Sequence, residues 1–131
     1  MIGYVTLGTN DIERAAKFYD ALFGEFGANR FMETERLIAW HTGSDRPGFG
    51  IIKPADGKPA SVGNGVMVAL HVETCEKVNT VYKKALELGG SDEGAPGPRG
   101  TEGFYAGYFR DLDGNKLNIF TLEKSTKSQI K

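Results

Sequence analysis

The chain has 131 residues, of which 40% are hydrophobic and 25% are charged, as in an ordinary globular protein with its own core. The formal net charge of −1 gives no reason to expect nucleic acid or an anionic membrane as a partner, and no apolar run is long enough to span a bilayer. The start of the chain has no secretory pattern and the single cysteine excludes an internal disulfide, so we expect a cytoplasmic protein.

The first half of the chain predicts a strand, a helix and three further strands. Residues 2–8 form the first strand, and Asn10 or Asp11 caps the helix, with Glu13 completing a capping box. Apolar residues at helical spacing between Ile12 and Phe23 form one stripe that can cover a sheet. The later strands are predicted at residues 29–33, 36–41 and 48–53.

The second half repeats this pattern. Residues 66–72 form a strand that places Met67 and His71 on one face, and Thr74 caps a helix that ends at Gly89 and Gly90. A short strand at 91–93, a Pro/Gly loop at 94–100 and a hairpin complete the half. The sequence therefore predicts an α+β protein made of two tandem βαβββ modules.

The predicted organisation is one domain, residues 1–124, with a flexible tail at 125–131. Module one covers about 1–60 and module two about 64–124. Each amphipathic helix can cover the apolar face of its own sheet. The other face of each sheet is mixed aromatic and polar, and we expect these faces to form the wall of a cavity.

The final hairpin carries the most specific motif of the chain. Its sequence is Tyr-Phe-Arg-Asp-Leu-Asp-Gly-Asn-Lys-Leu-Asn, from Tyr108 to Asn118, with a turn at Asp113 and Gly114. This segment resembles the closing strand pair of the vicinal oxygen chelate superfamily, which includes glyoxalase I, bleomycin-resistance proteins and extradiol dioxygenases. Together with the duplication, the resemblance implies a glyoxalase-like fold, in which the two modules form a cupped mixed sheet, and it implies a homodimer.

The resemblance also implies where a metal ion would lie. Metal-using members hold the ion with His and Glu side chains from four strands, and the matching positions here carry poorer donors: Tyr4, Ile52 (or Lys53 if the register slips), Met67 and Asn118. Phenol, thioether and amide groups are poor ligands for Ni, Zn, Fe or Mn. We therefore expect no metal site and no cofactor, although His41 and His71 could each supply one ligand.

The candidate site residues fall into two groups. His71 and Tyr108 are the candidate catalytic residues, because a histidine exchanges protons near neutral pH and a phenol can donate to a bound carbonyl. Arg99, in the Pro/Gly loop, is expected to grip a carboxylate or phosphate. The expected ligand-binding residues are Tyr4, Thr6, Trp40, Met67, Arg99, Asn118 and Phe120, and the aromatic ones favour a flat apolar ligand, with Phe49 and Phe104 adding to that aromatic surface.

Three functions stay open from the sequence. The leading prediction is a glyoxalase or bleomycin-resistance-like protein that binds a small organic ligand in a metal-free aromatic and polar cavity. The first alternative is a metal-independent or divergent isomerase, lyase or dioxygenase of the same superfamily that uses His71 as acid or base. The second alternative is a protein-interaction module with a filled core.

Overall fold

The structure is a computed structural model that describes residues 1–100 and 102–123. The chain divides into two compact units, Met1–Asn64 and Gly65–Lys131, which we describe separately. The expected flexible tail at 125–131 lies outside the described residues. Among the described residues, no helix is both long and apolar enough to cross a membrane.

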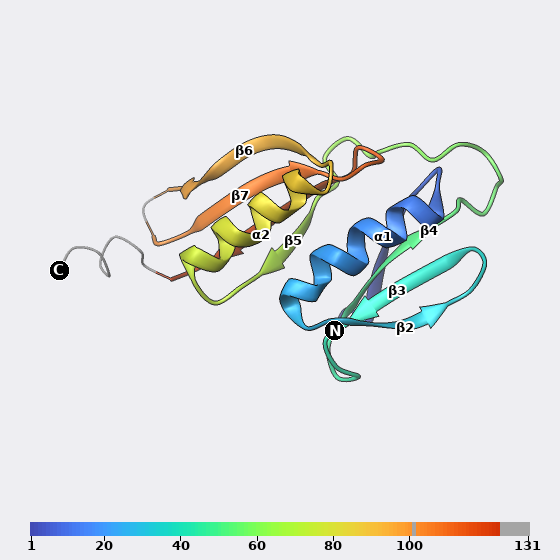
Figure 1. Ribbon diagram of the computed structural model, residues 1–131, viewed down its shortest axis with the longest axis horizontal. Helices are drawn as coiled ribbons and strands as arrows, with labels where there is room; N and C mark the ends of the chain where they lie inside the picture. Colours follow the sequence, from blue (N-terminus) through green and yellow to red (C-terminus); the bar gives the residue numbers. More distant parts are fainter. Residues whose placement is uncertain (101, 124–131) are drawn as a thin grey trace. The chain divides into compact units, whose positions relative to one another are not determined.

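The first unit is a four-stranded mixed sheet with one long helix (Figure 1). The strand order is β1-β4-β3-β2, in which β1 runs parallel to β4 and the other pairs are antiparallel. Its elements are β1 (Tyr4–Gly8), α1 (Ile12–Phe23), the short 3-10 helix η1 (Gly24–Phe26), β2 (Asn29–Glu33), β3 (Leu37–His41) and β4 (Gly48–Ile52).

The second unit repeats this topology, with α2 lying across one face of its sheet (Figure 1). The strand order is β5-β8-β7-β6, and β5 runs parallel to β8. Its elements are β5 (Val68–His71), α2 (Cys75–Glu87), β6 (Ser91–Pro98), β7 (Tyr105–Arg110) and β8 (Lys116–Thr121). The predicted α+β class and the two βαβββ repeats are thus confirmed.

The core of the first unit is an aromatic cluster between α1 and the sheet. The ring centroid of Tyr19 lies 4.8 Å from that of Phe49 and 5.8 Å from that of Trp40, and the Phe23 ring lies 5.2 Å from Phe49. Trp40 is only 2% exposed. The expectation that Trp40 and Phe49 line a ligand cavity is therefore corrected, because strand parity turns both rings toward the helix.

The core of the second unit is mainly aliphatic, with one buried phenylalanine. The α2 stripe of Val78, Val81 and Ala85 is fully buried, as are Phe109 on β7 and Leu117 and Ile119 on β8. Two tyrosines form hydrogen bonds between the helix and the sheet. The Tyr105 hydroxyl donates to Asn79 Oδ1 at 2.8 Å, and the Tyr82 hydroxyl donates to Asp92 Oδ1 at 2.6 Å. Burial, together with that second bond, raises the pKa of Tyr82 to about 12.

Both helix starts agree with the sequence, which predicted Asn10 or Asp11 as the cap of the first helix and Thr74 as the cap of the second. Thr74 caps α2 as predicted, because its hydroxyl accepts from Lys77 N at 3.0 Å. In α1 the cap is Asp11, whose carboxylate accepts from Arg14 N at 3.1 Å. The capping box built on Asn10 is wrong, since its amide side chain is bound to a distant loop instead.

Strand β6 is longer than predicted. The segment expected as a Pro/Gly loop continues the strand as far as Pro98, with two register irregularities on either side of Gly94. Gly94 adopts a φ of 150°, and its neighbour across the ladder is Tyr108. Bulges of this kind let an edge strand carry proline and glycine that a regular ladder excludes.

Candidate functional site

The face of the second sheet opposite α2 brings together most of the predicted site residues. In β7, Tyr105 and Phe109 face the helix, so Tyr108 lies on the opposite, open face. Asn118 is the cross-strand partner of Tyr108, and Phe120 is the partner of His71 on the parallel strand β5. Four predicted residues thus share the face of the sheet opposite α2, where Asn118 is buried.

The turn between β7 and β8 fixes the register of that surface. The buried Asp111 carboxylate accepts from the backbone N–H groups of Asp113 and Asn115, both at 2.9 Å, and Gly114 N donates to Asp111 O at 3.0 Å. Gly114 has a φ of 90°, a conformation that glycine adopts at little cost. The sequence signal for a tight turn is confirmed, and it aligns Lys116 with Arg110 across the pair.

Tyr108 carries two cations on its ring. The guanidinium carbon of Arg99 lies 5.4 Å from the ring centroid, and Lys116 Nζ lies 5.5 Å from it. Both distances are within the range of a cation–π interaction. Neither cation forms an ion pair with a carboxylate of residues 1–100 or 102–123. The positive charges of Arg99 and Lys116, both next to the Tyr108 ring, favour the binding of an anion at this site.

Arg99 is held rigidly in this arrangement. Its Nη2 donates to Ala95 O at 2.8 Å, its Nη1 donates to Gly97 O at 2.9 Å, and its backbone N donates to Phe104 O at 2.7 Å. Arg99 directly follows strand β6 and so lies outside the strands, as predicted, although residues 94–98 of the predicted loop belong to β6. The side chain folds back over Tyr108, and its guanidinium is anchored before any ligand arrives.

Asn118 is the cross-strand partner of Tyr108, and its buried side-chain oxygen has no hydrogen-bond partner within residues 1–100 and 102–123. Its side chain is 2% exposed, and among the described residues Asn118 Oδ1 accepts no hydrogen bond. An unsatisfied buried amide costs about 1–3 kcal/mol, so folds retain one chiefly where it serves a purpose. A ligand group that donates a hydrogen bond would relieve this cost.

The apolar part of the surface is provided by rings. Phe104 stacks on Phe120 with centroids 5.5 Å apart, and the exposed His71 ring meets Phe120 edge-on at 5.3 Å. Within the described residues, His71 has no carboxylate partner that would orient its ring. The cluster combines aromatic area, two cations and an unsatisfied acceptor.

The remaining predicted residues belong to other segments of the chain. Tyr4 and Thr6 lie on β1 in the first unit, on the face opposite the helix, and Tyr4 is 50% exposed. Met67 precedes β5 and is 39% exposed. His41 stacks flat on Phe31, with centroids 4.2 Å apart. Lys116 was not among the predicted site residues, although the alternation of β8 places it on the face of Asn118 and Phe120.

The donor types present do not fit a metal ion. Within residues 1–100 and 102–123, no group of three or more His, Cys, Asp or Glu side chains is placed to hold one. The phenol, thioether and amide at the positions that the resemblance points to are weak donors for hard divalent ions. We derive no chemical step through a metal.

Comparison with known proteins places this geometry in a family. Residues 1–119 match the profile of the Glyoxalase/Bleomycin resistance protein/Dioxygenase superfamily. A glyoxalase/bleomycin resistance protein from Albidiferax ferrireducens is 32% identical, with a TM-score of 0.83 over 92% of this chain and 98% of that one. No curated protein matches the chain.

Two further solved structures share the fold. A hypothetical protein from S. aureus is 26% identical, with a TM-score of 0.71 over 92% of both chains. A glyoxalase/bleomycin resistance protein/dioxygenase family enzyme from Burkholderia phytofirmans is 21% identical, with a TM-score of 0.75 over 92% of this chain and 97% of that one. The profile match and the Albidiferax relative cover most of the chain, and the chain therefore belongs to the Glyoxalase/Bleomycin resistance protein/Dioxygenase superfamily.

Proposed function

We propose that the protein binds a small aromatic organic anion on the open face of the second sheet. The observation that carries the proposal is the Tyr108 ring with two cations, Arg99 and Lys116, that have no carboxylate partner among the described residues. An anionic group near the ring would compensate both charges at once. Charge-assisted hydrogen bonds to the anchored Arg99 would add geometric specificity.

The neighbouring groups define the rest of the ligand. The Phe104 and Phe120 rings favour a flat apolar body, since aromatic rings prefer offset or edge contacts with one another. The unsatisfied Asn118 Oδ1 favours a hydroxyl or amine that can donate a hydrogen bond. A compact aromatic acid with a hydroxyl group satisfies all three requirements.

Binding without turnover is the primary proposal. A histidine that acts as general base is normally oriented by a second group, and His71 has no such carboxylate within the described part of the chain. An acid–base enzyme that uses His71 and Tyr108 is the second candidate. It is favoured by the place of both residues on one face, where each pairs with a neighbour on β8.

Three probes separate the contributions. We would titrate the full chain by calorimetry with para-hydroxybenzoate, with benzoate and with para-hydroxybenzyl alcohol. We expect para-hydroxybenzoate to bind best, because benzoate lacks the donor for Asn118 and the alcohol lacks the charge for Arg99 and Lys116. Equal affinity for the neutral alcohol and the acid would contradict the proposal.

Single substitutions, with a matched control, test which residues bind the ligand. Lys116→Gln and Arg99→Gln should each weaken para-hydroxybenzoate binding by about tenfold, the effect of losing one charge-assisted contact. Lys17→Gln, an exposed lysine on α1 of the first unit, should leave the affinity unchanged. If His71→Ala abolishes a measurable turnover while affinity stays constant, the enzyme candidate replaces simple binding.

A further inference from the structure

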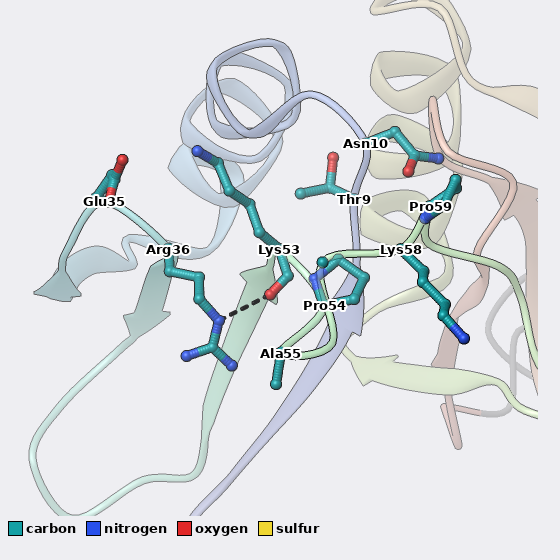
Figure 2. A pocket seen from close by; sticks show the side chains of 10 residues that line it. Thr9, Asn10, Glu35, Arg36, Lys53, Pro54, Ala55, Lys58 and Pro59 are labelled. Atoms are coloured by element: carbon teal, nitrogen blue, oxygen red, sulfur yellow. Dashed lines mark hydrogen bonds between the residues drawn. The ribbon is translucent and has the colours of Figure 1, made fainter.

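A hollow in the first unit has a volume of about 530 Å³, within the range of small-molecule pockets (Figure 2). Three segments build it: the turn after β1 with Thr9 and Asn10, the β2–β3 turn with Glu35 and Arg36, and most of the loop 53–59 after β4. All of these residues belong to the unit Met1–Asn64, so the hollow shares no residue with the Tyr108 surface of the second unit.

The loop that closes this hollow is held in place by its neighbours. Ala60 N donates to Asn10 Oδ1 at 2.6 Å, and the Asn10 amide donates back to Ala60 O at 3.4 Å. Gly57, with a φ of 76°, closes a turn by donating to Pro54 O at 3.1 Å. A Cβ on Gly8 would lie 2.9 Å from that of Ala60, which shows how closely the strand and the loop approach. The hollow is therefore formed before any ligand binds.

The lining of the hollow is positively charged. Arg36, Lys53 and Lys58 contribute three positive charges against the one negative charge of Glu35. Within the described residues none of the three cations is in an ion pair. The same loop carries Asp56, which is not among the lining residues and whose carboxylate accepts from the backbone N–H of Lys58 at 2.9 Å. A chain with a net charge of −1 thus concentrates unpaired positive charge at this spot.

Arg36 is the fixed member of this group. Its Nε donates to Lys53 O at 3.0 Å, and the two residues also share a backbone bond, Lys53 N to Arg36 O, at 2.9 Å. The Nη atoms make no hydrogen bond to described residues, so they remain available as a fork for an oxyanion. In Figure 2 the Glu35 carboxylate points away from this guanidinium, and the side chains of Lys53 and Lys58 extend away from it in different directions.

We propose that this hollow binds the phosphate or carboxylate group of a small molecule. Arg36 provides the positioned fork, and the exposed side chains of Lys53 and Lys58 turn onto the bound anion. Pro54 and Pro59 in the lining offer rigid apolar contacts to the body of such a molecule. This site goes beyond the ligand surface proposed for the second unit and depends on none of its residues.

The test uses inorganic phosphate and malonate as separate probes of the full, isotope-labelled chain. At constant ionic strength, we expect saturable shifts of the backbone amide signals of Arg36, Lys53 and residues 57–60. Saturation by phosphate alone would identify a phosphate site, and saturation by malonate alone a carboxylate site. Shifts that grow linearly for both probes, without saturation, would mean only diffuse charge screening and would overturn the proposal.

Variants assign the binding to the named residues. Arg36→Gln should lower the affinity by about tenfold, and Arg36→Lys by less, because it keeps the charge and loses the fork. Lys83→Gln, on α2 of the second unit, should change nothing. Unchanged affinity in Arg36→Gln would refute the assignment.

Two further variants keep the test decisive. If Arg36→Gln does not fold, the double change Lys53→Gln and Lys58→Gln replaces it, and unchanged affinity in that variant would refute the assignment equally. Arg99→Gln should leave phosphate binding intact, which separates this result from the fate of the Tyr108 surface.

Discussion

Asp20 accepts a hydrogen bond from the indole of Trp40, with 2.9 Å between Asp20 Oδ1 and Trp40 Nε1. The other oxygen of the same carboxylate accepts from Arg30 Nη2 at 2.7 Å. The indole N–H is therefore satisfied inside the first unit, and the ring remains buried in the core. Because Trp40 is hydrogen-bonded to a carboxylate on α1, it stabilises the core and does not contact a ligand.

Replacing Asp20 by Asn should change how stability depends on pH. The hydrogen bond from Arg30 holds the pKa of the Asp20 carboxyl below its ordinary value. The ionised carboxylate thus stabilises the native state above the unfolded-state pKa, and this contribution is lost as the pH falls through the native-state pKa.

The difference in unfolding free energy between native protein and Asp20→Asn should be about 0.5–1 kcal/mol near neutral pH, since this side chain is 46% exposed. It should shrink toward zero as the pH is lowered from about 5 to about 2 in urea titrations. The exposed Glu73→Gln serves as control and should show a much smaller change. A difference that stays constant over this range would contradict the role of ionisation.

Glycines after the two helices should respond oppositely to alanine. A Cβ on Gly90 would lie 2.8 Å from Arg110 O and 2.9 Å from Ala85 O, and neither backbone atom can move cheaply. Gly24 has a helical φ of −58° and open space around it. We expect Gly90→Ala to cost about 1–3 kcal/mol and Gly24→Ala to be neutral or to stabilise by about 0.4–1 kcal/mol. Denaturant midpoints of both variants decide this, and equal costs would refute the steric argument.

Removing the unsatisfied amide should stabilise the protein and impair binding. Asn118→Leu replaces a buried polar group by an apolar one of similar size, so we expect a gain of about 1–2 kcal/mol in unfolding free energy. Para-hydroxybenzoate affinity should fall at the same time. Thr121→Val is the matched control on β8, because Thr121 Oγ1 accepts from Glu123 N at 3.1 Å and its loss should destabilise. Destabilisation by both changes would argue that Asn118 has a partner that matters.

Chelation should leave the protein unaffected. After dialysis against EDTA, the melting temperature and the affinity for para-hydroxybenzoate should match those of the untreated sample, because the proposed contacts are all side-chain groups of the chain itself. Elemental analysis of the same preparation gives the independent measurement. About one metal ion per chain, together with a melting temperature that drops by several degrees on chelation, would overturn the metal-free proposal.

The parts of the fold that follow local rules were predictable. Thr74 as a cap, the helix stripe ending at Phe23, and the Gly114 turn each rest on interactions within a few residues. The alternation of side chains along a strand correctly predicted that Tyr108 and Phe109 lie on opposite faces of the sheet. Each of these features depends only on residues that are close to one another in the sequence, so the sequence alone is enough to predict it.

The features that were missed depend on distant partners. The capping box failed because Asn10 is hydrogen-bonded to Ala60, fifty positions along the chain. Trp40 was assigned to a cavity because its hydrogen bond to Asp20 is invisible without the packed helix. The proposed oxyanion hollow needs Arg36 and Lys53, at the ends of two paired strands, to meet, which only the sheet register reveals.

The two faces of strand β8 differ in how freely their residues can be substituted during evolution. Leu117 and Ile119 carry the buried core, while Lys116 and Phe120, on the other side of the ladder, remain partly exposed. Mutations of Lys116 and Phe120 can therefore change which ligand binds without destabilising the fold. A library randomised at Lys116 and Phe120, with Leu117 and Ile119 held constant, should thus yield many folded members with new ligand preferences. The two-residue period of a strand makes this scaffold easy to diversify.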